Sequence, residues 1–250
     1  MKNPQTSTQP SLPPVNKKGK FIILSGPSCV GKGPLVETLI LYFKSVGTKF
    51  KKHVLYTSRG MRPGEEDGKT YHFWGKGKQD AEAKKNPQCQ TFMVPPDQQM
   101  INLETLKGEL ETYDVVLLEI SITNVPKILK ACDSFGIPAK QIFVSPLSED
   151  DFQVIGGSFN KKHDREIALR AVMLTKLANR GTETKGKQKT RFDKAPAEMQ
   201  AAIHNNAKIV CNHFGEDNKR LWKLLQEFVS EPGSLEIAKT FIEFAKEIEQ

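Results

Sequence analysis

The chain has 250 residues, of which 38% are hydrophobic and 26% charged, and its formal net charge at pH 7 is +8. This composition fits one folded domain with small insertions and excludes a chain that is disordered throughout. No apolar run approaches the ~18 residues of a membrane span, and residues 1–18 are polar and proline-rich without the apolar segment of a secretory signal. We expect residues 1–18 to be a disordered tail.

The first predicted unit is a strand, a glycine-rich loop and a helix. Phe21–Ser25 is a short apolar run typical of a buried strand, and apolar residues recur at helical spacing after Pro34, which suits the first turn of a helix. Between them, Gly26, Gly31 and Lys32 satisfy the pattern G-x-x-x-x-G-K, in which backbone N–H groups at a helix N-terminus surround a phosphate. Because the pattern lies between a strand and a helix, we predict a P-loop.

The rest of the chain alternates between strands and helices. Strands are expected at 53–58, 114–120, 141–145 and 207–212, and helices at 102–112, 124–135, 148–155, 165–180, 191–205, 217–229 and 234–249. Asn102 and Ser148 are expected to cap their helices, and Gly136 to end one. Polar segments at 59–75, 156–164 and 181–190 separate these elements, and the last is expected to be mobile. This alternation predicts an α/β fold whose central parallel sheet is flanked by helices.

A second candidate phosphate site lies in the polar segment that follows the predicted strand 53–58. Two arginines three residues apart, Arg59 and Arg62, are followed by Glu65 and Tyr71 in a loop rich in turn residues. Guanidinium groups bind the oxygens of a phosphate monoester with paired hydrogen bonds, and the tyrosine hydroxyl can add a contact. Taken alone, these residues are also compatible with a charged hairpin on the surface.

Both motifs resemble those of the guanylate kinase family. GPSCVGKG is similar to the family's phosphate loop GPSG-[VA]-GKG, with Cys29 in place of a glycine. TSRGMRPGEEDGKTYHF matches every fixed position of the family's T-[ST]-R-x-x-R-x-G-E-x-x-G-x-x-Y-x-F. NRGTETKGKQKTR resembles the family's lid, RFDKAPAEM the helix after it, and KIVCN the strand beside the adenine. Residues 155–170 look like an insertion and 234–249 like an addition to this pattern.

The resemblance implies a P-loop kinase that transfers the γ-phosphoryl group of ATP to a nucleoside monophosphate, most often GMP, with Mg²⁺ as cofactor. It implies a kinase domain at 19–233 with a small monophosphate-binding arm at about 54–103 and a mobile lid at about 176–191. The insertion at about 155–170 and the expected C-terminal helix at 234–250 are additions to that pattern. The expected partners are therefore ATP and a nucleoside monophosphate.

The resemblance also assigns roles to individual residues. It implies that cations stabilise the transferring phosphoryl group, namely Lys32, Lys176, Arg180 and Arg191. It implies that ATP is bound by Gly26, Pro27, Ser28, Cys29, Val30, Gly31, Lys32, Gly33 and Asn212. GMP would be bound by Arg59, Arg62, Glu65, Tyr71, Glu119 and Ser121. No residue of the protein is expected to bind the metal directly, because Gly33 and Pro34 follow the lysine where a hydroxyl ligand is usual.

The region that should recognise the base departs from the family pattern. The family has a glutamate and a tyrosine in a stretch that reads here CQTFMVPPDQQMINL, with neither residue. Gln90, Asp97, Gln98 and Gln99 offer other polar contacts, Leu55 replaces a usual serine, and the usual second acid after Glu119 is Ser121. Because a site that hydrogen-bonds a base edge discriminates strongly, losing these acceptors should weaken selection for guanine.

Cysteine usage and charge favour a cytoplasmic enzyme. The cysteines Cys29, Cys89, Cys132 and Cys211 are far apart and form no metal-binding spacing, so we expect reduced thiols and no structural metal site. The lysines are scattered without interleaved aromatic residues, so neither nucleic acid nor a membrane is expected as a partner. Two alternatives to a GMP kinase stay open: a kinase of another phosphate monoester, such as a sugar phosphate, and a non-catalytic binding module of the same fold.

Overall fold

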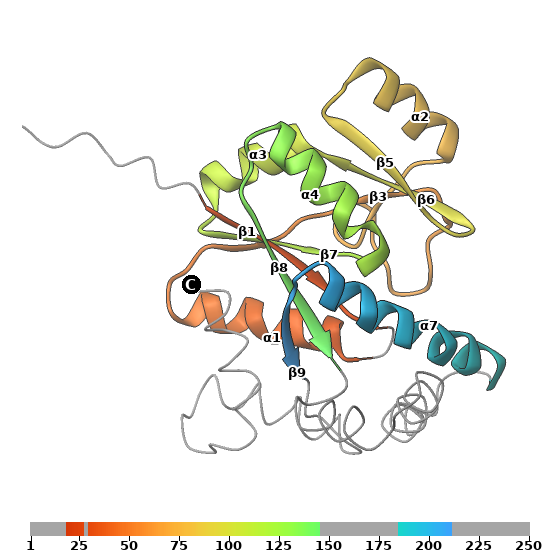
Figure 1. Cartoon of the computed structure of the whole chain (residues 1–250). Helices are drawn as coiled ribbons and strands as arrows, with labels where there is room; N and C mark the ends of the chain where they lie inside the picture. Colours follow the sequence, from red (N-terminus) through yellow and green to blue (C-terminus); the bar gives the residue numbers. More distant parts are fainter. Residues whose placement is uncertain (1–18, 28–29, 146–184, 212–250) are drawn as a thin grey trace, which may run out of the picture.

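The computed structural model describes residues 19–27, 30–145 and 185–211. Its centre is a parallel sheet in the order β2-β7-β1-β8-β9 (Figure 1). The strands are β1 (Lys20–Ser25), β2 (Phe50–Lys52), β7 (Val115–Glu119), β8 (Ala139–Ser145) and β9 (Lys208–Cys211). Over the described ranges, no helix has the length and apolar character needed to cross a membrane. The predicted α/β fold with a central parallel sheet is confirmed.

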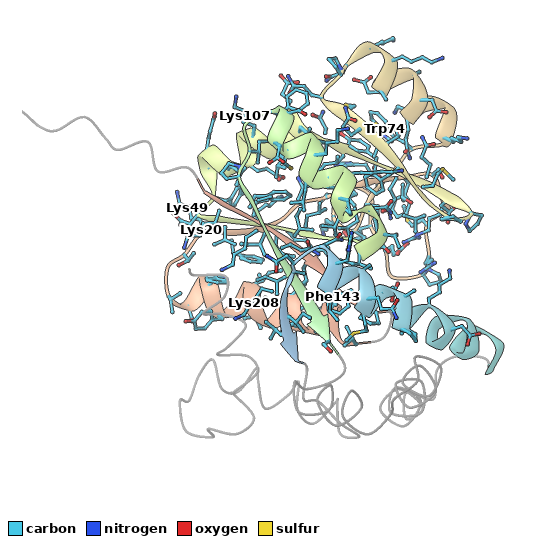
Figure 2. All side chains as sticks on the ribbon, viewed as in Figure 1. Lys20, Lys49, Trp74, Lys107, Phe143 and Lys208 are labelled. Atoms are coloured by element: carbon cyan, nitrogen blue, oxygen red, sulfur yellow. The ribbon has the colours of Figure 1, made fainter. Side chains whose placement is uncertain are left out.

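Helices cover both faces of this sheet because successive strand residues point to opposite sides. Ile22 and Leu24 of β1 belong to a core cluster with α1 (Lys32–Ser45), whereas Phe21 and Ile23 belong to a second cluster on the other face. The second cluster includes residues of α3 (Leu103–Thr112), α4 (Val125–Ser134) and α7 (Lys185–His204). Figure 2 shows Phe143 of β8, a fully buried member of the second cluster, in the middle of the molecule.

The predicted ends of two helices are confirmed by their geometry. The Asn102 side chain accepts hydrogen bonds from the backbone N–H groups of Glu104 and Thr105, which caps α3. Helix α4 ends before Gly136, whose φ of 64° lies in the left-handed region that favours glycine. Between β7 and α4 lies a short 3-10 helix, η1 (Ile122–Asn124).

A small second sheet, which we call the arm, projects from the central domain (Figure 1). It is formed in the order β4-β3-β6-β5 by β3 (Tyr56–Thr57), β4 (His72–Phe73), β5 (Cys89–Val94) and β6 (Asp97–Asn102), with helix α2 (Lys76–Lys85) packed on it. Sequence patterning misses α2 because polar contacts hold it to the sheet. The buried Gln79 donates to the Trp74 carbonyl oxygen at 2.8 Å, and Gln98 donates to Asp80 at 2.7 Å.

Two predicted boundaries are wrong. Of the expected strand at 53–58, only Tyr56–Thr57 is a strand, β3 of the arm. The neighbouring strand of the central sheet, β2, ends earlier at Lys52, because the chain crosses to the arm at residues 53–55. The expected mobile segment 181–190 is helical from Lys185 onward, as the start of α7. Its lysines and glutamine favour a helix without forming an apolar stripe, so periodicity does not reveal it. The predicted tail, the expected helices at 148–155, 165–180, 217–229 and 234–249, and most of the predicted lid lie outside the described residues.

Candidate functional site

The G-x-x-x-x-G-K motif connects β1 to α1 at the carboxyl edge of the central sheet. Gly31 precedes the first helical residue with a φ of 87°, and Gly26 has a φ of 149°. A Cβ atom on Gly26 would lie 2.5 Å from the carbonyl oxygen of Val144, so only glycine fits there. Ser28 and Cys29 lie outside the described residues. The remaining geometry is that of a loop that presents backbone N–H groups at a helix N-terminus.

Lys32 turns its ammonium group back over this loop. Its Nζ donates to the carbonyl oxygens of Gly26 and Pro27, each at 2.8 Å. Lys32 is part-buried, and its positive charge therefore lies beside the N–H groups that would surround a phosphate. The main-chain contacts fix the direction of the side chain before any ligand is present.

Glu198 of α7 lies close enough to Lys32 for the two charges to interact. Burial raises the pKa of the Glu198 carboxyl, and the charges of Lys32 and Lys194 oppose that rise. Sequence reasoning missed this residue. The sequence does carry a signal for it. Glu198 is three residues from the buried Ala195 and four from the buried Ala202, which places an acid on the buried face of the helix.

In the arm, Arg59 and Glu65 form a paired ionic contact. Arg59 Nη1 donates to Glu65 Oε2 at 2.6 Å and Nη2 donates to Oε1, and each side chain is only 15% exposed. The backbone N–H of Arg62 donates to the same carboxylate at 2.8 Å, so Glu65 holds both arginines of the loop. The Arg59 guanidinium also lies over the rings of Tyr71 and Phe73, 5.0 and 5.7 Å from their centroids.

This contact leaves one edge of Arg59 without a partner among the described residues. A guanidinium carries five N–H donors. Two point at Glu65 and another Nη1–H donates to the Gly60 carbonyl oxygen at 2.9 Å. The Nε–H and the second Nη2–H remain, and they form the side-on fork that matches two oxygens of a phosphate. Arg59 is therefore oriented by Glu65 while keeping a bidentate donor edge.

The Glu65 carboxylate should make the stability of the protein depend on pH. Hydrogen bonds from Arg59, and then from the Arg62 backbone, lower the pKa of Glu65 from 4.5 to about 2. Because this pKa is depressed, the contribution of Glu65 is present above pH 4.5 and is lost as the pH falls toward 2. We expect the urea-unfolding free energy of the wild type to fall more steeply between pH 5 and 3 than that of Glu65→Gln.

Glu66→Gln serves as the control for this titration. Glu66 is 64% exposed and pairs with the exposed Lys69, so its replacement should leave the pH dependence of the unfolding free energy unchanged. Equal slopes for the wild type and Glu65→Gln would contradict the assignment.

The register of the arm sheet decides which polar residues share its inner face. Gln90 pairs with Ile101, Phe92 with Gln99, and Thr57 with both Gln99 and Phe73, so these side chains lie on one face. Phe92 and Ile101 belong to the core cluster of the central domain, which identifies this face as the inner one. Asp97 lies on the same face, and its charge interacts with Arg59. Gln98 faces away from the central domain, toward α2.

Glu119 is the last residue of β7, and Ser121 follows it by two residues. Glu119 is in register with Leu24 of β1, beside the strand that leads into the P-loop, and accepts a hydrogen bond from Lys52 at 3.0 Å. The Ser121 and Thr123 hydroxyls are hydrogen-bonded to each other at 3.0 Å. The predicted contact of Glu119 and Ser121 with an acceptor stays a prediction.

The other predicted site residues cannot be placed in this geometry. Lys176, Arg180 and Asn212 lie outside the described residues, and Arg191 is in α7 with a side chain that is not described. Their roles stay predictions.

Comparison with known proteins decides the family. A family model described as guanylate kinase matches residues 18–205, which is most of the chain. The chain belongs to the guanylate kinase family. The match includes the P-loop, the arm and α7, and it ends just before β9.

Individual guanylate kinases match shorter parts of the chain. A guanylate kinase of Lactiplantibacillus plantarum is 34% identical over 112 residues, which are 45% of this chain and 53% of that protein. One of Aster yellows witches'-broom phytoplasma is 51% identical over 59 residues, 24% of this chain and 26% of that protein. The matched part is thus about half, or less, of the length of these curated relatives.

A solved structure agrees on the fold. The crystal structure of guanylate kinase from Anaplasma phagocytophilum is similar over 93% of this chain and 95% of that chain, with a TM-score of 0.51 at 15% identity. At this identity the similarity supports the shared guanylate kinase fold alone.

Proposed function

We propose that the protein is an ATP-dependent nucleoside-monophosphate kinase that converts GMP to GDP. The observation that carries this proposal is the presence of two separate groups suited to phosphate. One is the P-loop with Lys32 on the central sheet, and the other is the free donor edge of Arg59 on the arm. A kinase of this type must bind a donor and an acceptor phosphate on two elements. A module that only holds a peptide needs neither group.

The chemistry requires positioning and charge neutralisation more than a covalent nucleophile. The P-loop N–H groups would bind the β- and γ-phosphates of ATP, and Lys32 would exchange its two carbonyl partners for phosphate oxygens. Arg59, Arg62 and the Tyr71 hydroxyl would hold the acceptor phosphate. Lys176, Arg180 and Arg191 would close over the transferring group and neutralise it, and Asn212 would lie beside the adenine.

Mg²⁺ belongs to this proposal as an ion that arrives with ATP. Among the described residues, no group of three or more His, Cys, Asp or Glu side chains is placed to hold a metal. Gly33 and Pro34 provide no hydroxyl after Lys32. These residues fit an ion held by phosphate oxygens and water, with Glu119 as the acid beside the P-loop strand. When bound, the ion neutralises charge on the phosphates.

The base preference of the acceptor site is proposed to be relaxed. Besides Asp97, whose charge interacts with Arg59, the inner face of the arm offers Gln90 and Gln99, which carry amides instead of the carboxylate and phenol of the family pattern. An amide has one acceptor oxygen and two N–H donors, whereas a carboxylate accepts at both oxygens. Paired N–H groups of guanine therefore lose an acceptor, and purines without the 2-amino group are penalised less.

The free thiols support a cytoplasmic location. Cys89 and Cys132 are free and buried, which fits a reducing compartment. We therefore place the activity in the cytoplasm as part of the same proposal.

An acceptor panel tests the proposed reaction. The purified protein receives ATP, Mg²⁺ and one of GMP, dGMP, IMP, AMP, UMP, CMP or ribose 5-phosphate, and ADP release is measured. We expect GMP to be the best acceptor and IMP to follow within about tenfold in kcat/KM, because one lost acceptor is worth about 1 kcal/mol. Gln90→Glu should widen the gap between GMP and IMP.

The competing functions predict different panels. Turnover with ribose 5-phosphate, but with none of the nucleoside monophosphates, would identify the protein as a kinase of another phosphate monoester. No turnover with any acceptor, together with no ATP binding, would leave only a non-catalytic module.

A further inference from the structure

The chain crosses between the central domain and the arm at two places. It enters the arm at residues 53–55, between β2 and β3, and leaves it where β6 runs directly into α3 at Asn102–Leu103. The residues at these crossings determine how the arm sits on the central domain. His53 lies at the entry, and Glu109 lies on the helix that follows the exit.

A short buried contact joins the entry to the helix that follows the exit. His53 Nδ1 lies 2.6 Å from Glu109 Oε2, and the two side chains are only 1% and 15% exposed. The His53 backbone N–H donates to the Leu117 carbonyl oxygen of β7 at 2.8 Å. His53 is thus bound by its main chain to the central sheet and by its imidazole to α3.

Both members of the pair have buried apolar neighbours in the chain. Leu55, two residues after His53, and Leu106 and Leu110, beside Glu109 on α3, are all buried core residues. His53 Nε2 is also buried, and it has no hydrogen-bond partner among the described residues. A buried nitrogen without a hydrogen-bond partner lowers the stability of the fold, and an apolar side chain of similar size would avoid that cost. A buried polar pair in such a place favours a role in fixing one arrangement over a role in stability alone.

We propose that His53 and Glu109 are positioning residues that hold the arm, and with it Arg59, in register with the P-loop. Arg59 follows His53 by six residues through the short strand β3, whose partner β6 leads into α3. A change of direction at His53 is therefore carried to Arg59, whereas Lys32 lies on β1–α1 and is unaffected. The kinetic part of this inference rests on the proposed function, because it takes Arg59 as the group that binds the acceptor phosphate.

The test replaces each member of the pair in turn and measures the KM for GMP and the KM for ATP separately. His53→Leu should raise the KM for GMP about tenfold, which is the size of coupling expected between contacting residues. The KM for ATP should change by less than about twofold. Glu109→Ala should raise the KM for GMP and spare the KM for ATP in the same way. Because Glu109 is less buried than His53, this variant is expected to fold even if His53→Leu does not. His53→Asn, which keeps a donor near Nδ1, should recover most of the affinity for GMP.

Hydrogen exchange provides a readout that does not depend on activity. We expect faster amide exchange in both variants at residues 53–58 and 102–106, with β1 and β8 unchanged. Glu111→Ala, an exposed acid on the same helix, is the matched control and should alter neither exchange nor KM. If the wild type phosphorylates no monophosphate, the proposed function is wrong. The hydrogen-exchange result still tests whether the His53–Glu109 contact positions the arm. Equal increases in both KM values, exchange that rises throughout the chain, or no change at all would overturn the positioning role.

Discussion

Lys32→Ala is expected to lower kcat for phosphoryl transfer by about 10³-fold, the scale of losing one preorganised charge that stabilises a transition state. The ammonium lies over the P-loop, held by the Gly26 and Pro27 carbonyl oxygens, so its position is set before ATP binds. Removing it takes away a positive charge at the donor phosphates and leaves those carbonyl dipoles facing anionic oxygens. Steady-state ADP release at saturating ATP and GMP measures the effect.

Lys44→Ala controls for the loss of a lysine from the same helix. Lys44 is exposed in the last turn of α1, so its replacement should change kcat by less than about twofold. A Lys32→Ala enzyme that kept the wild-type rate would show that the loop does not hold the donor phosphates.

Arg59→Ala is expected to raise the KM for GMP at least about 30-fold while the KM for ATP stays close to its wild-type value. Removing a largely buried cation from its contact with a bound phosphate costs on the order of 2–5 kcal/mol of binding free energy. The change also leaves Glu65 without its partner, as an uncompensated anion near the place where the acceptor phosphate would bind. Initial-rate kinetics with each substrate varied in turn separates the two KM values.

The double variant Arg59→Ala/Glu65→Gln separates lost attraction from new repulsion. Removing the Glu65 charge should recover part of the affinity for GMP. The KM of Arg59→Lys for GMP should also lie between those of the wild type and Arg59→Ala, because an ammonium group keeps the charge but cannot form the side-on fork. Lys69→Ala, a change of an exposed cation in the same loop, should have little effect. Equal increases in both KM values after Arg59→Ala would contradict an acceptor-specific role.

The sequence could predict the elements whose patterns are local. The apolar run before GPSCVGKG, the cap at Asn102 and the stop at Gly136 each lie within a few residues of the feature they specify. Helix α2 could not be predicted in this way, because polar contacts and no apolar stripe attach it to the arm: Gln79 donates to the Trp74 carbonyl oxygen, and Asp80 accepts from Gln98 on the facing strand. The start of α7 was hidden for a related reason, since its first turns carry no apolar stripe.

The sequence by itself determined that the chain has a P-loop and a paired-arginine loop, because both motifs place glycines, cations and an acid within a short stretch. Only the tertiary structure decided how these residues act. Strand register, which depends on pairing between distant segments, placed Gln90 and Gln99 on the inner face of the arm and turned Gln98 away. Packing of α3 against the arm entry brought Glu109 within 2.6 Å of His53, 56 residues earlier in the chain. Such contacts follow from the burial of apolar faces on separate elements, and no local pattern specifies them.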